Sequence, residues 1–285
     1  MLRPGLDVTR PVEAARRHLE RFTRLSRMAK DITLDEDRLA GRPALRFAPA
    51  QPDPRRVLLY LHGGAYVFGS PRTHRALCSH LARACRATVY ALDYRKAPEH
   101  PAPAAGEDAL RALRAVAERH PDSALVLAGD SAGAGLVLAT LFALRDAGQP
   151  LPACAYLICP WGDLRLENDS LRRNRANEPL LTRDNLALCA EYYAAGTDLG
   201  APSLSPALGD YRGLPPLYIQ AAGNDILLDD ARQIAQAARE AGTPVKVEVF
   251  ADMFHDFQTL PDWLPEARRA LMLAGAWIKA TAGQA

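Results

Sequence analysis

The chain has 285 residues, 48% of them hydrophobic and 24% charged, which is typical of a folded globular protein and excludes a disordered one. Its 35 basic and 33 acidic residues leave a net charge of +2, so the composition gives no electrostatic reason to expect nucleic-acid binding. Five cysteines without a C-x-x-C spacing, no apolar signal segment and no run of about 18 apolar residues predict a cytoplasmic protein with free thiols and no membrane span.

Residues 11–29 place apolar side chains at helical spacing with arginines around them, which predicts a basic amphipathic helix. A membrane-surface role is one interpretation, but packing over a neighbouring domain requires the same apolar stripe and is preferred. Residues 1–30 are therefore assigned to an N-terminal cap helix. From Ile32 to Phe47, two short extended segments flank Ala40-Gly41 and predict a β-hairpin.

The next part of the chain alternates apolar strand-like runs with helical stretches. The non-alternating apolar runs, expected of strands covered on both faces, are 57–61, 87–92, 124–128, 155–158 and 216–221. The helical stretches are 73–85, 104–119, 132–147, 229–241 and 264–280. The run 245–250 alternates, and we expect it nearer an edge. With the hairpin, this pattern predicts an α/β fold: a mostly parallel, doubly wound, eight-stranded sheet with its site at the carboxyl ends of the strands.

Residues 162–215 interrupt this alternation, because they are too many for a crossover connection. They contain a polar run and a helical stretch near 182–193, and we interpret them as an inserted cap over the strand ends. Residues 31–161 and 216–285 are then the two parts of the core domain.

The run 124–128 leads into Gly129-Asp-Ser-Ala-Gly133 and then into a helical stretch rich in Leu and Ala. A G-x-S-x-G sequence at a sharp strand-to-helix turn exposes the serine hydroxyl, so Ser131 is the candidate nucleophile. The motif alone is weak, because Ser131 could equally be an N-cap residue between two turn glycines. A serine nucleophile also needs a base, an acid that orients the base, and donors for an oxyanion.

If the base follows the nucleophile along the chain, only His255 of the seven histidines qualifies. It follows the last strand, from which a loop can carry it back over the sheet. Asp225, directly after the run 216–221, is the candidate acid that holds the His255 ring. Asp229 and Asp230 are rivals, but an N-cap or helix-dipole role explains both.

The segment after the run 57–61 contains two consecutive glycines, Gly63 and Gly64, whose amides can face one point. With the amide of Ala132 they are the expected oxyanion hole. His62 is expected to fix this loop, and no metal site is predicted, because no carboxylate or second histidine lies at ligand spacing. Apolar residues beside these segments are the candidate substrate-binding wall: Tyr66, Phe68, Trp161, Ile226 and Leu227.

Six motifs occur in order: His62-Gly-Gly-Ala65, Asp93-Tyr-Arg-Lys-Ala-Pro-Glu-His-Pro101, Gly129-Asp-Ser-Ala-Gly-Ala134, Pro160-Trp-Gly-Asp-Leu164, Gly223-Asn-Asp225 and His255-Asp-Phe257. Together they resemble the bacterial hormone-sensitive-lipase-like (family IV) carboxylesterases of the α/β-hydrolase superfamily, from about residue 45 to the C-terminus. The resemblance implies an α/β-hydrolase fold with a helical cap, a Ser-Asp-His triad and hydrolysis of small carboxylic esters without a cofactor. It also implies a homodimer through the strand 245–250.

Four residues depart from the patterns of that family: Ala65 and Ala134 replace glycines, Lys96 replaces a leucine, and Ile226 replaces the proline after the acid. None is expected to touch a reacting atom, so they bear on substrate fit. The resulting prediction is a serine carboxylesterase that hydrolyses small, short-acyl esters through an acyl-enzyme. A lactone hydrolase acting on cyclic, for example monoterpene-type, esters is the alternative, and the presence of His255 argues against a non-enzymatic ligand-binding module.

Overall fold

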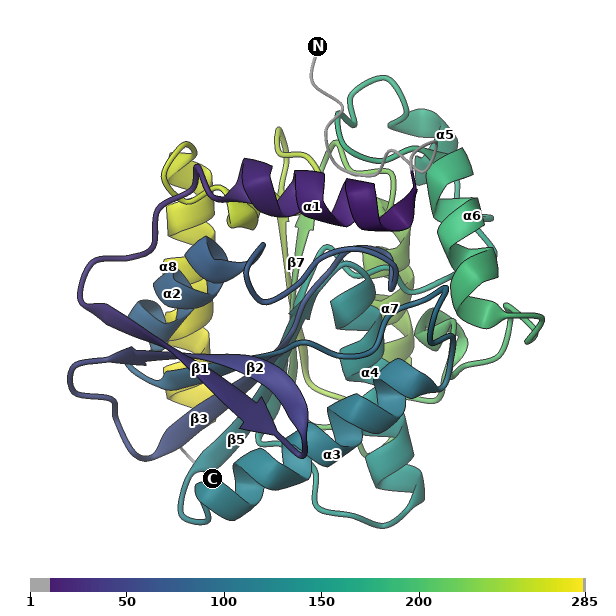
Figure 1. Cartoon of the computed structure of the whole chain (residues 1–285). Coiled ribbons are helices and arrows are strands. Elements are labelled where there is room, and N and C mark those ends of the chain that lie inside the picture. The colour runs from purple at the N-terminus through teal and green to yellow at the C-terminus, as the bar shows by residue number, and fades with distance from the viewer. Residues whose placement is uncertain (1–10, 284–285) are drawn as a thin grey trace.

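An eight-stranded sheet forms the centre of the structure, a computed structural model that describes residues 11–283 (Figure 1). In spatial order the strands are β1 (Ile32–Leu39), β2 (Arg42–Pro49), β4 (Thr88–Leu92), β3 (Arg56–Leu61), β5 (Ala124–Asp130), β6 (Cys154–Ile158), β7 (Leu217–Ala222) and β8 (Val245–Phe250). β2 pairs antiparallel with β1 and β4, and all other neighbours pair parallel. The predicted hairpin and mostly parallel, eight-stranded α/β sheet are confirmed.

Helices cover both faces of the sheet (Figure 1). One face carries α2 (Arg75–Cys85) and α8 (Pro265–Thr281), and the other carries α3 (Ala104–Arg119), α4 (Ala132–Asp146) and α7 (Leu228–Glu240). Successive side chains of a strand point to opposite faces. Leu58 of β3 therefore enters the core under α2 and α8, whereas Leu59 enters the core on the other face. This two-sided burial is the reason that the strand runs are apolar without alternation.

β8 is an edge strand, as its alternating sequence predicts. Its residues are half-buried or exposed, and Val249 is 44% exposed. The homodimer through this edge stays a prediction, which light scattering of the purified protein tests directly.

The cap residues lie along the carboxyl ends of the strands, where Figure 1 shows α1 (Val12–Thr23) crossing above the sheet beside α5 (Ser170–Arg173) and α6 (Arg183–Ala194). Arg16 fixes α1, because its guanidinium binds the carbonyls of Val67 and Ala97 and the carboxylate of Glu99. This anchoring favours packing over the core as the role of the amphipathic helix. The domain boundaries themselves stay an interpretation.

α1 ends at Thr23, six residues before the limit expected from the sequence. The Arg75 side chain binds the carbonyl of Arg24, and the amide of Ala29 donates to Ser79 Oγ. These contacts draw residues 24–29 out of the helix and against α2. Two short 3-10 helices, η1 (Pro206–Leu208) and η2 (Phe257–Thr259), complete the described elements.

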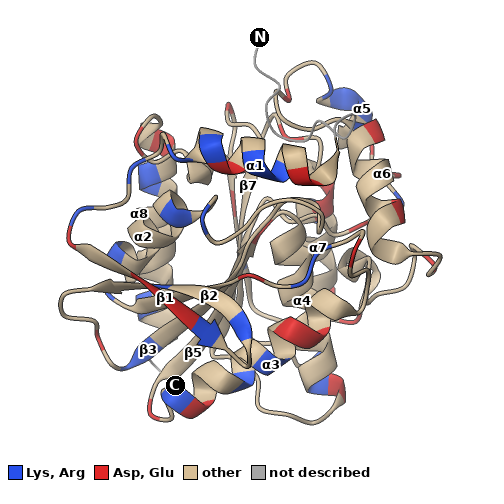
Figure 2. Ribbon diagram, viewed as in Figure 1, with Lys and Arg blue, Asp and Glu red and all other residues tan. Residues whose placement is uncertain are grey.

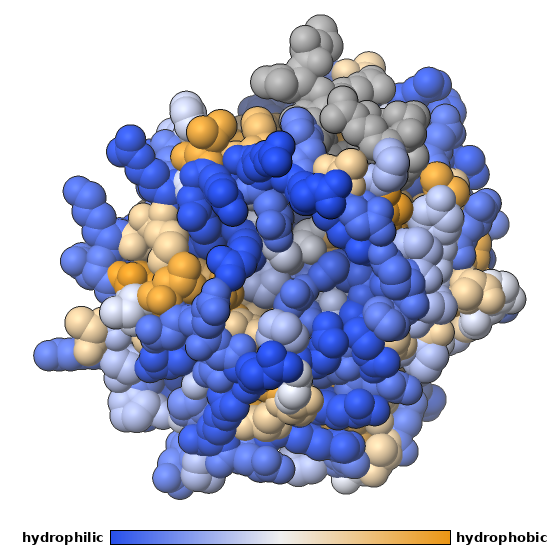
Figure 3. All heavy atoms as spheres, viewed as in Figure 1, coloured by the Kyte–Doolittle hydropathy of each residue, from blue (hydrophilic) through white to orange (hydrophobic). Residues whose placement is uncertain are grey.

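The surface of the molecule is mixed in charge. Basic and acidic residues are interspersed over the ribbon in Figure 2, and the face in Figure 3 is mostly hydrophilic with small, separate apolar patches. Within residues 11–283, no helix is both long enough and apolar enough to span a bilayer. These features agree with the balanced composition of the sequence.

Candidate active site

Ser131 stands at the sharp turn between β5 and α4. Its backbone has φ 52° and ψ −122°, a strained conformation for a residue other than glycine, and its amide donates to the carbonyl of Ile158 at 2.8 Å. A Cβ on Gly133 would lie 2.0 Å from the carbonyl oxygen of Leu61, so this glycine is required for α4 to approach β3. The Ser131 side chain makes no capping hydrogen bond, which argues against a simple N-cap role.

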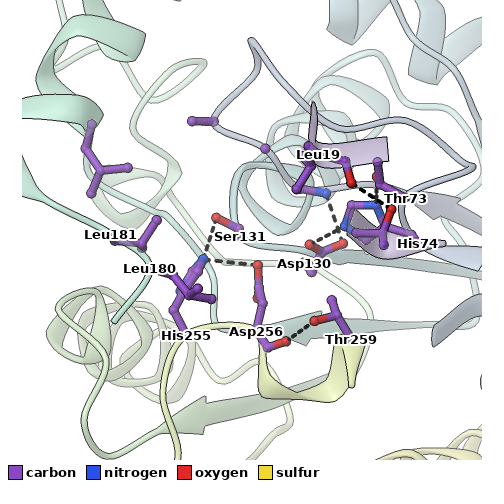
Figure 4. A pocket seen from close by; sticks show the side chains of 15 residues that line it. Leu19, Thr73, His74, Asp130, Ser131, Leu180, Leu181, His255, Asp256 and Thr259 are labelled. Atoms are coloured by element: carbon purple, nitrogen blue, oxygen red, sulfur yellow. Dashed lines mark hydrogen bonds and ion pairs between the residues drawn. The ribbon is translucent and has the colours of Figure 1, made fainter. Parts of the chain in front are cut away.

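The Ser131 hydroxyl lies against the His255 ring, as Figure 4 shows. Nε2 of His255 is 2.9 Å from Ser131 Oγ, and Nδ1 is 2.8 Å from Oδ2 of Asp225. The second oxygen of Asp225 accepts the amide of Leu227 at 2.8 Å. The three side chains that the sequence predicted as a triad, from the ends of β5, β7 and β8, are therefore in contact, and all three are buried.

The environment of His255 favours the charged form of its ring. Burial alone lowers the pKa of a histidine, but the carboxylates of Asp225 and Asp256 outweigh this effect and raise the pKa of His255 well above its ordinary value. A ring that gains a proton from a serine hydroxyl is stabilised by such neighbours. The arrangement is thus able to support general base chemistry at Ser131.

The rival carboxylates are engaged elsewhere. Asp229 pairs with Arg173 and Arg232 on the surface. Asp230 accepts the amides of Gly162 and Asp163 at 2.8 and 2.9 Å and is buried. Asp230 therefore fixes the start of the cap segment, residues 162–215, and neither carboxylate contacts His255.

The oxyanion donors differ from the sequence prediction at one position. The amide of Gly63 donates to Asp130 Oδ1 at 2.9 Å, so its proton is already used. Within residues 11–283, the amides of Gly64, Ala65 and Ala132 have no hydrogen-bond acceptor. The backbone φ of 117° at Gly64 and 52° at Ala65 turns this loop sharply. The structure corrects Gly63 from a donor to an anchor and adds Ala65 as a candidate donor.

Asp130, the residue before the serine, organises this loop. It is fully buried, and besides Gly63 it accepts the Tyr60 hydroxyl at 2.6 Å and lies 3.0 Å from His74 Nε2 (Figure 4). Burial raises the pKa of a carboxyl group, but the charge and hydrogen bond of His74 outweigh it here and lower the pKa of Asp130 to about 2. Sequence reasoning missed this cluster, although the place of the aspartate directly before the serine in the G-x-S-x-G motif was a usable signal.

His62 lies inside the loop, as expected. Its Nδ1 is 2.8 Å from the carbonyl oxygen of Gly63, and its ring stacks on Tyr94 at a centroid distance of 4.2 Å. Burial lowers the pKa of His62 well below its ordinary value. The ring therefore acts as a neutral spacer that shapes the loop.

Glu178 of the cap segment contacts the histidine loop. Its Oε2 accepts the amide of His255 at 3.0 Å, and its Oε1 accepts the amide of Leu180 at 2.8 Å. Only 3% of this residue is exposed, and burial raises the pKa of its carboxyl group. A single side chain thus ties the cap segment to the backbone of the candidate base, a contact that no sequence motif indicated.

A cavity of about 130 Å³ opens onto Ser131 and His255. The cap contributes apolar walls: Figure 4 shows Leu19 from α1 and Leu180 and Leu181 from the cap segment. Leu186 of the cap segment also lines the cavity. The remaining lining residues are Thr23, Gly63, Gly64, Ala65, Thr73, His74, Asp130, Asp256 and Thr259. The cavity thus lies between the strand ends and both parts of the cap.

The five residues expected to form the apolar wall do not line this cavity, and the structure corrects that expectation. Tyr66 stacks on Tyr193 at 3.7 Å, and the side chains of Phe68, Trp161 and Leu227 are buried in the core. Ile226 lines a separate cavity within the cap segment. Closeness in sequence to the catalytic segments does not decide where a side chain points, and these apolar side chains turn into the core.

The described residues contain one group that could ligate a metal ion, Cys159 with Asp225 and His255. Two of its three members are already bound to each other in the triad contact, and all three are buried. This donor set gives no reason to place a metal at the site.

Comparisons with known proteins agree with this geometry. A family described as alpha/beta hydrolase fold matches residues 58–259. An acetyl-hydrolase from Streptomyces hygroscopicus is 52% identical over 237 residues, which cover 83% of this chain and 79% of that protein. An esterase from Acinetobacter venetianus is 34% identical over 262 residues, covering 90% and 86%.

A crystal structure of an esterase from the bacterial hormone-sensitive lipase family superposes with a TM-score of 0.93 at 38% sequence identity, covering 96% of this chain and 92% of that one. The family match, these relatives and the similar structure all indicate an esterase with the α/β-hydrolase fold. The chain therefore belongs to the α/β-hydrolase fold family and is a carboxylic ester hydrolase of the hormone-sensitive-lipase-like group.

Proposed function

We propose that the chain hydrolyses small, short-acyl carboxylic esters through an acyl-enzyme formed on Ser131. The observation that carries this proposal is the unbroken contact from the Ser131 hydroxyl through both nitrogens of His255 to Asp225, at 2.9 and 2.8 Å. A serine hydroxyl is a weak nucleophile without such a base, and the base needs a partner that fixes its tautomer.

In this mechanism Nε2 of His255 takes the proton of Ser131 as Oγ attacks the ester carbonyl. The carbonyl oxygen becomes an oxyanion, for which the amides of Gly64, Ala65 and Ala132 are the donors. The His255 proton then passes to the departing alkoxide, which leaves as the alcohol. Water, deprotonated in turn by His255, releases the acid and restores the hydroxyl, so the reaction requires no cofactor.

The dimensions of the site support a short acyl chain. The cavity at Ser131 is about 130 Å³ and is bounded by three leucines of the cap segment. The Streptomyces hygroscopicus relative is named an acetyl-hydrolase. Crystals of EstE5, 35% identical with a TM-score of 0.92 and covering 99% of this chain and 95% of that one, were soaked with p-nitrophenyl butyrate. The relatives named here are esterases and acetyl-hydrolases, so the lactone-hydrolase alternative is not favoured.

We expect kcat/KM to be highest for p-nitrophenyl acetate to butyrate and to fall about tenfold or more by decanoate, because a longer chain has to displace the cap leucines. Initial rates across the acyl series measure this profile, with a panel of lactones in parallel. A maximum at decanoate or beyond contradicts the short-acyl proposal, and turnover of lactones above that of all linear esters contradicts the substrate class.

Leu180 and Leu181 each line two cavities, and Leu181 offers a sharper test. It lines both the cavity at Ser131 and a larger one of about 860 Å³ within the cap segment. Truncation in Leu181→Ala should join the two spaces and raise the octanoate-to-acetate ratio of kcat/KM by about tenfold. Leu171→Ala is the matched control, because Leu171 lines only the larger cavity. An unchanged ratio in Leu181→Ala, or the same rise in the control, contradicts this role.

A further inference from the structure

A second carboxyl group contacts the candidate base on the side of the nucleophile. Oδ2 of Asp256 lies 3.0 Å from Nε2 of His255, the nitrogen that also lies 2.9 Å from Ser131 Oγ (Figure 4). The carboxylate of Asp225 contacts the other ring nitrogen, Nδ1. The imidazole is therefore held between two carboxyl groups, and Nε2 carries at most one proton for two oxygen partners.

The backbone directs the Asp256 side chain toward the ring. Asp256 has φ 52°, in the left-handed region, and its carbonyl oxygen accepts both the amide and the hydroxyl of Thr259 at 2.9 and 2.7 Å. Its side chain is 13% exposed and lines the cavity. An aspartate tolerates this backbone conformation better than most residues. The turn into η2 thus fixes the carboxyl group beside Nε2.

The electrostatic surroundings leave Asp256 poorly stabilised as an anion except by His255. Its Oδ1 is buried and has no hydrogen-bond partner among the described residues. Burial raises the pKa of Asp256 to about 7, the charge of Asp130 adds to this effect, and His255 opposes it. Each of the two groups therefore changes the pKa of the other, because the charged imidazole lowers the pKa of Asp256 and the carboxylate of Asp256 raises the pKa of His255.

Other titratable groups face this pair from every neighbouring element. Around the His255 ring and its backbone stand Asp225 after β7, Ser131 after β5, Cys159 after β6 and Glu178 from the cap segment. Beyond Asp256 stand Asp130, His74 and Tyr60 of β3. Asp225 and Glu178 contact Nδ1 and the backbone amide, not Nε2. Asp256 is the one carboxyl group within the described residues that shares Nε2 with the nucleophile.

We propose that Asp256 is a positioning residue that binds the Nε2 proton of His255 in the free enzyme, in competition with Ser131, and thereby sets the pH at which the base becomes available. The inference rests on the proposed role of His255 as the base. In the ionised form, Asp256 holds the imidazolium. The same contact stabilises the imidazolium that forms in the transition state, so Asp256 raises the rate at high pH and suppresses it at low pH.

The contact with Asp256 determines in which direction the acidic limb of the pH profile is displaced. A histidine is active as a base when neutral, so a raised pKa moves the acidic limb of the kcat/KM profile to higher pH. Asp256→Asn removes the charge and keeps the size, and it should move this limb to lower pH by about one unit or more. Above the limb the variant should be about tenfold slower, because its imidazolium keeps Asp225 at Nδ1 but loses the second carboxylate at Nε2. The two profiles therefore cross.

Crossing profiles separate this role from a structural one, which lowers activity at every pH without moving the limb. Asp256→Gly provides a second variant suited to the left-handed backbone, and Asp252→Asn is the matched control, because Asp252 lies exposed on the same loop. Circular dichroism and thermal melting establish that each variant is folded.

An acidic limb that stays in place in a folded Asp256→Asn or Asp256→Gly variant overturns the proposal. So does a limb at or below pH 6.5 in the unaltered enzyme, because its histidine would then have an ordinary pKa of about 6.5. Failure of the proposed base is distinguishable, because it appears as retained turnover in Ser131→Ala and His255→Ala, whereas the Asp256 variants are expected to stay active.

Discussion

Replacement of Ser131 by alanine is expected to lower kcat/KM for p-nitrophenyl acetate by about 10⁴-fold or more, because it removes the hydroxyl that contacts His255 Nε2 and would form the acyl-enzyme. A residual rate over water should persist, because the oxyanion donors and the cavity are retained. His255→Ala should cost about as much, and the double variant little more than either single one, because nucleophile and base act as a unit.

The matched measurement is covalent labelling. A fluorophosphonate should add one adduct mass to the parent protein, at Ser131, and none to Ser131→Ala. The variant should melt within a few degrees of the parent, because alanine removes one hydroxyl from a position whose strained backbone is held by the Ile158 contact. A Ser131→Ala protein that still turns over the ester at a rate near that of the parent, or is still labelled, would show that the nucleophile lies elsewhere.

The sheet was predictable because strands that are buried on both faces are apolar without alternation, and this pattern is visible in the sequence. The predicted limits of the apolar strands β3, β5 and β7 lie within a residue or two of the observed ones. β8 alternates because it lies at the edge of the sheet, where its side chains are only half-buried or exposed. α5 was not predicted, because a helix of four residues has too few turns to show a period. The end of α1 was missed because contacts from α2 draw the following residues away.

The site was predictable where chain order and local turns decide it. Ser131, Asp225 and His255 each follow a parallel strand, so the topology brings them to one end of the sheet. Glu178 and the pairing of His74 with Asp130 depend on contacts across 77 and 56 residues, which no local pattern encodes. The same limit applies to Gly63, whose amide is available or occupied according to a carboxylate from another strand.

The second large effect is expected for Asp130→Ala, which removes the carboxylate that accepts the Gly63 amide. The substitution leaves the Tyr60 hydroxyl, the Gly63 amide and the His74 ring without their common buried acceptor. Removal of one partner from a buried charged cluster is expected to lower the free energy of unfolding by about 3–5 kcal/mol. Because the oxyanion loop loses its anchor, kcat should also fall by about 10²–10³-fold, the cost typical of losing an oxyanion donor.

Urea unfolding followed by circular dichroism measures the stability change, and Asp35→Ala is the control, because the exposed pair of Asp35 with Arg46 should contribute only about 0–1 kcal/mol.

The pH dependence of the free energy of unfolding provides an independent check on the role of Asp130. The pKa of Asp130 is lowered to about 2, so its contribution is present above the ordinary aspartate pKa and is lost as the pH falls toward 2. The difference in free energy of unfolding between the parent and Asp130→Asn should therefore become smaller as the pH falls from the ordinary aspartate pKa toward 2. A gap that is small at neutral pH, or constant with pH, would mean that the loop is held by its backbone turn and not by this carboxylate.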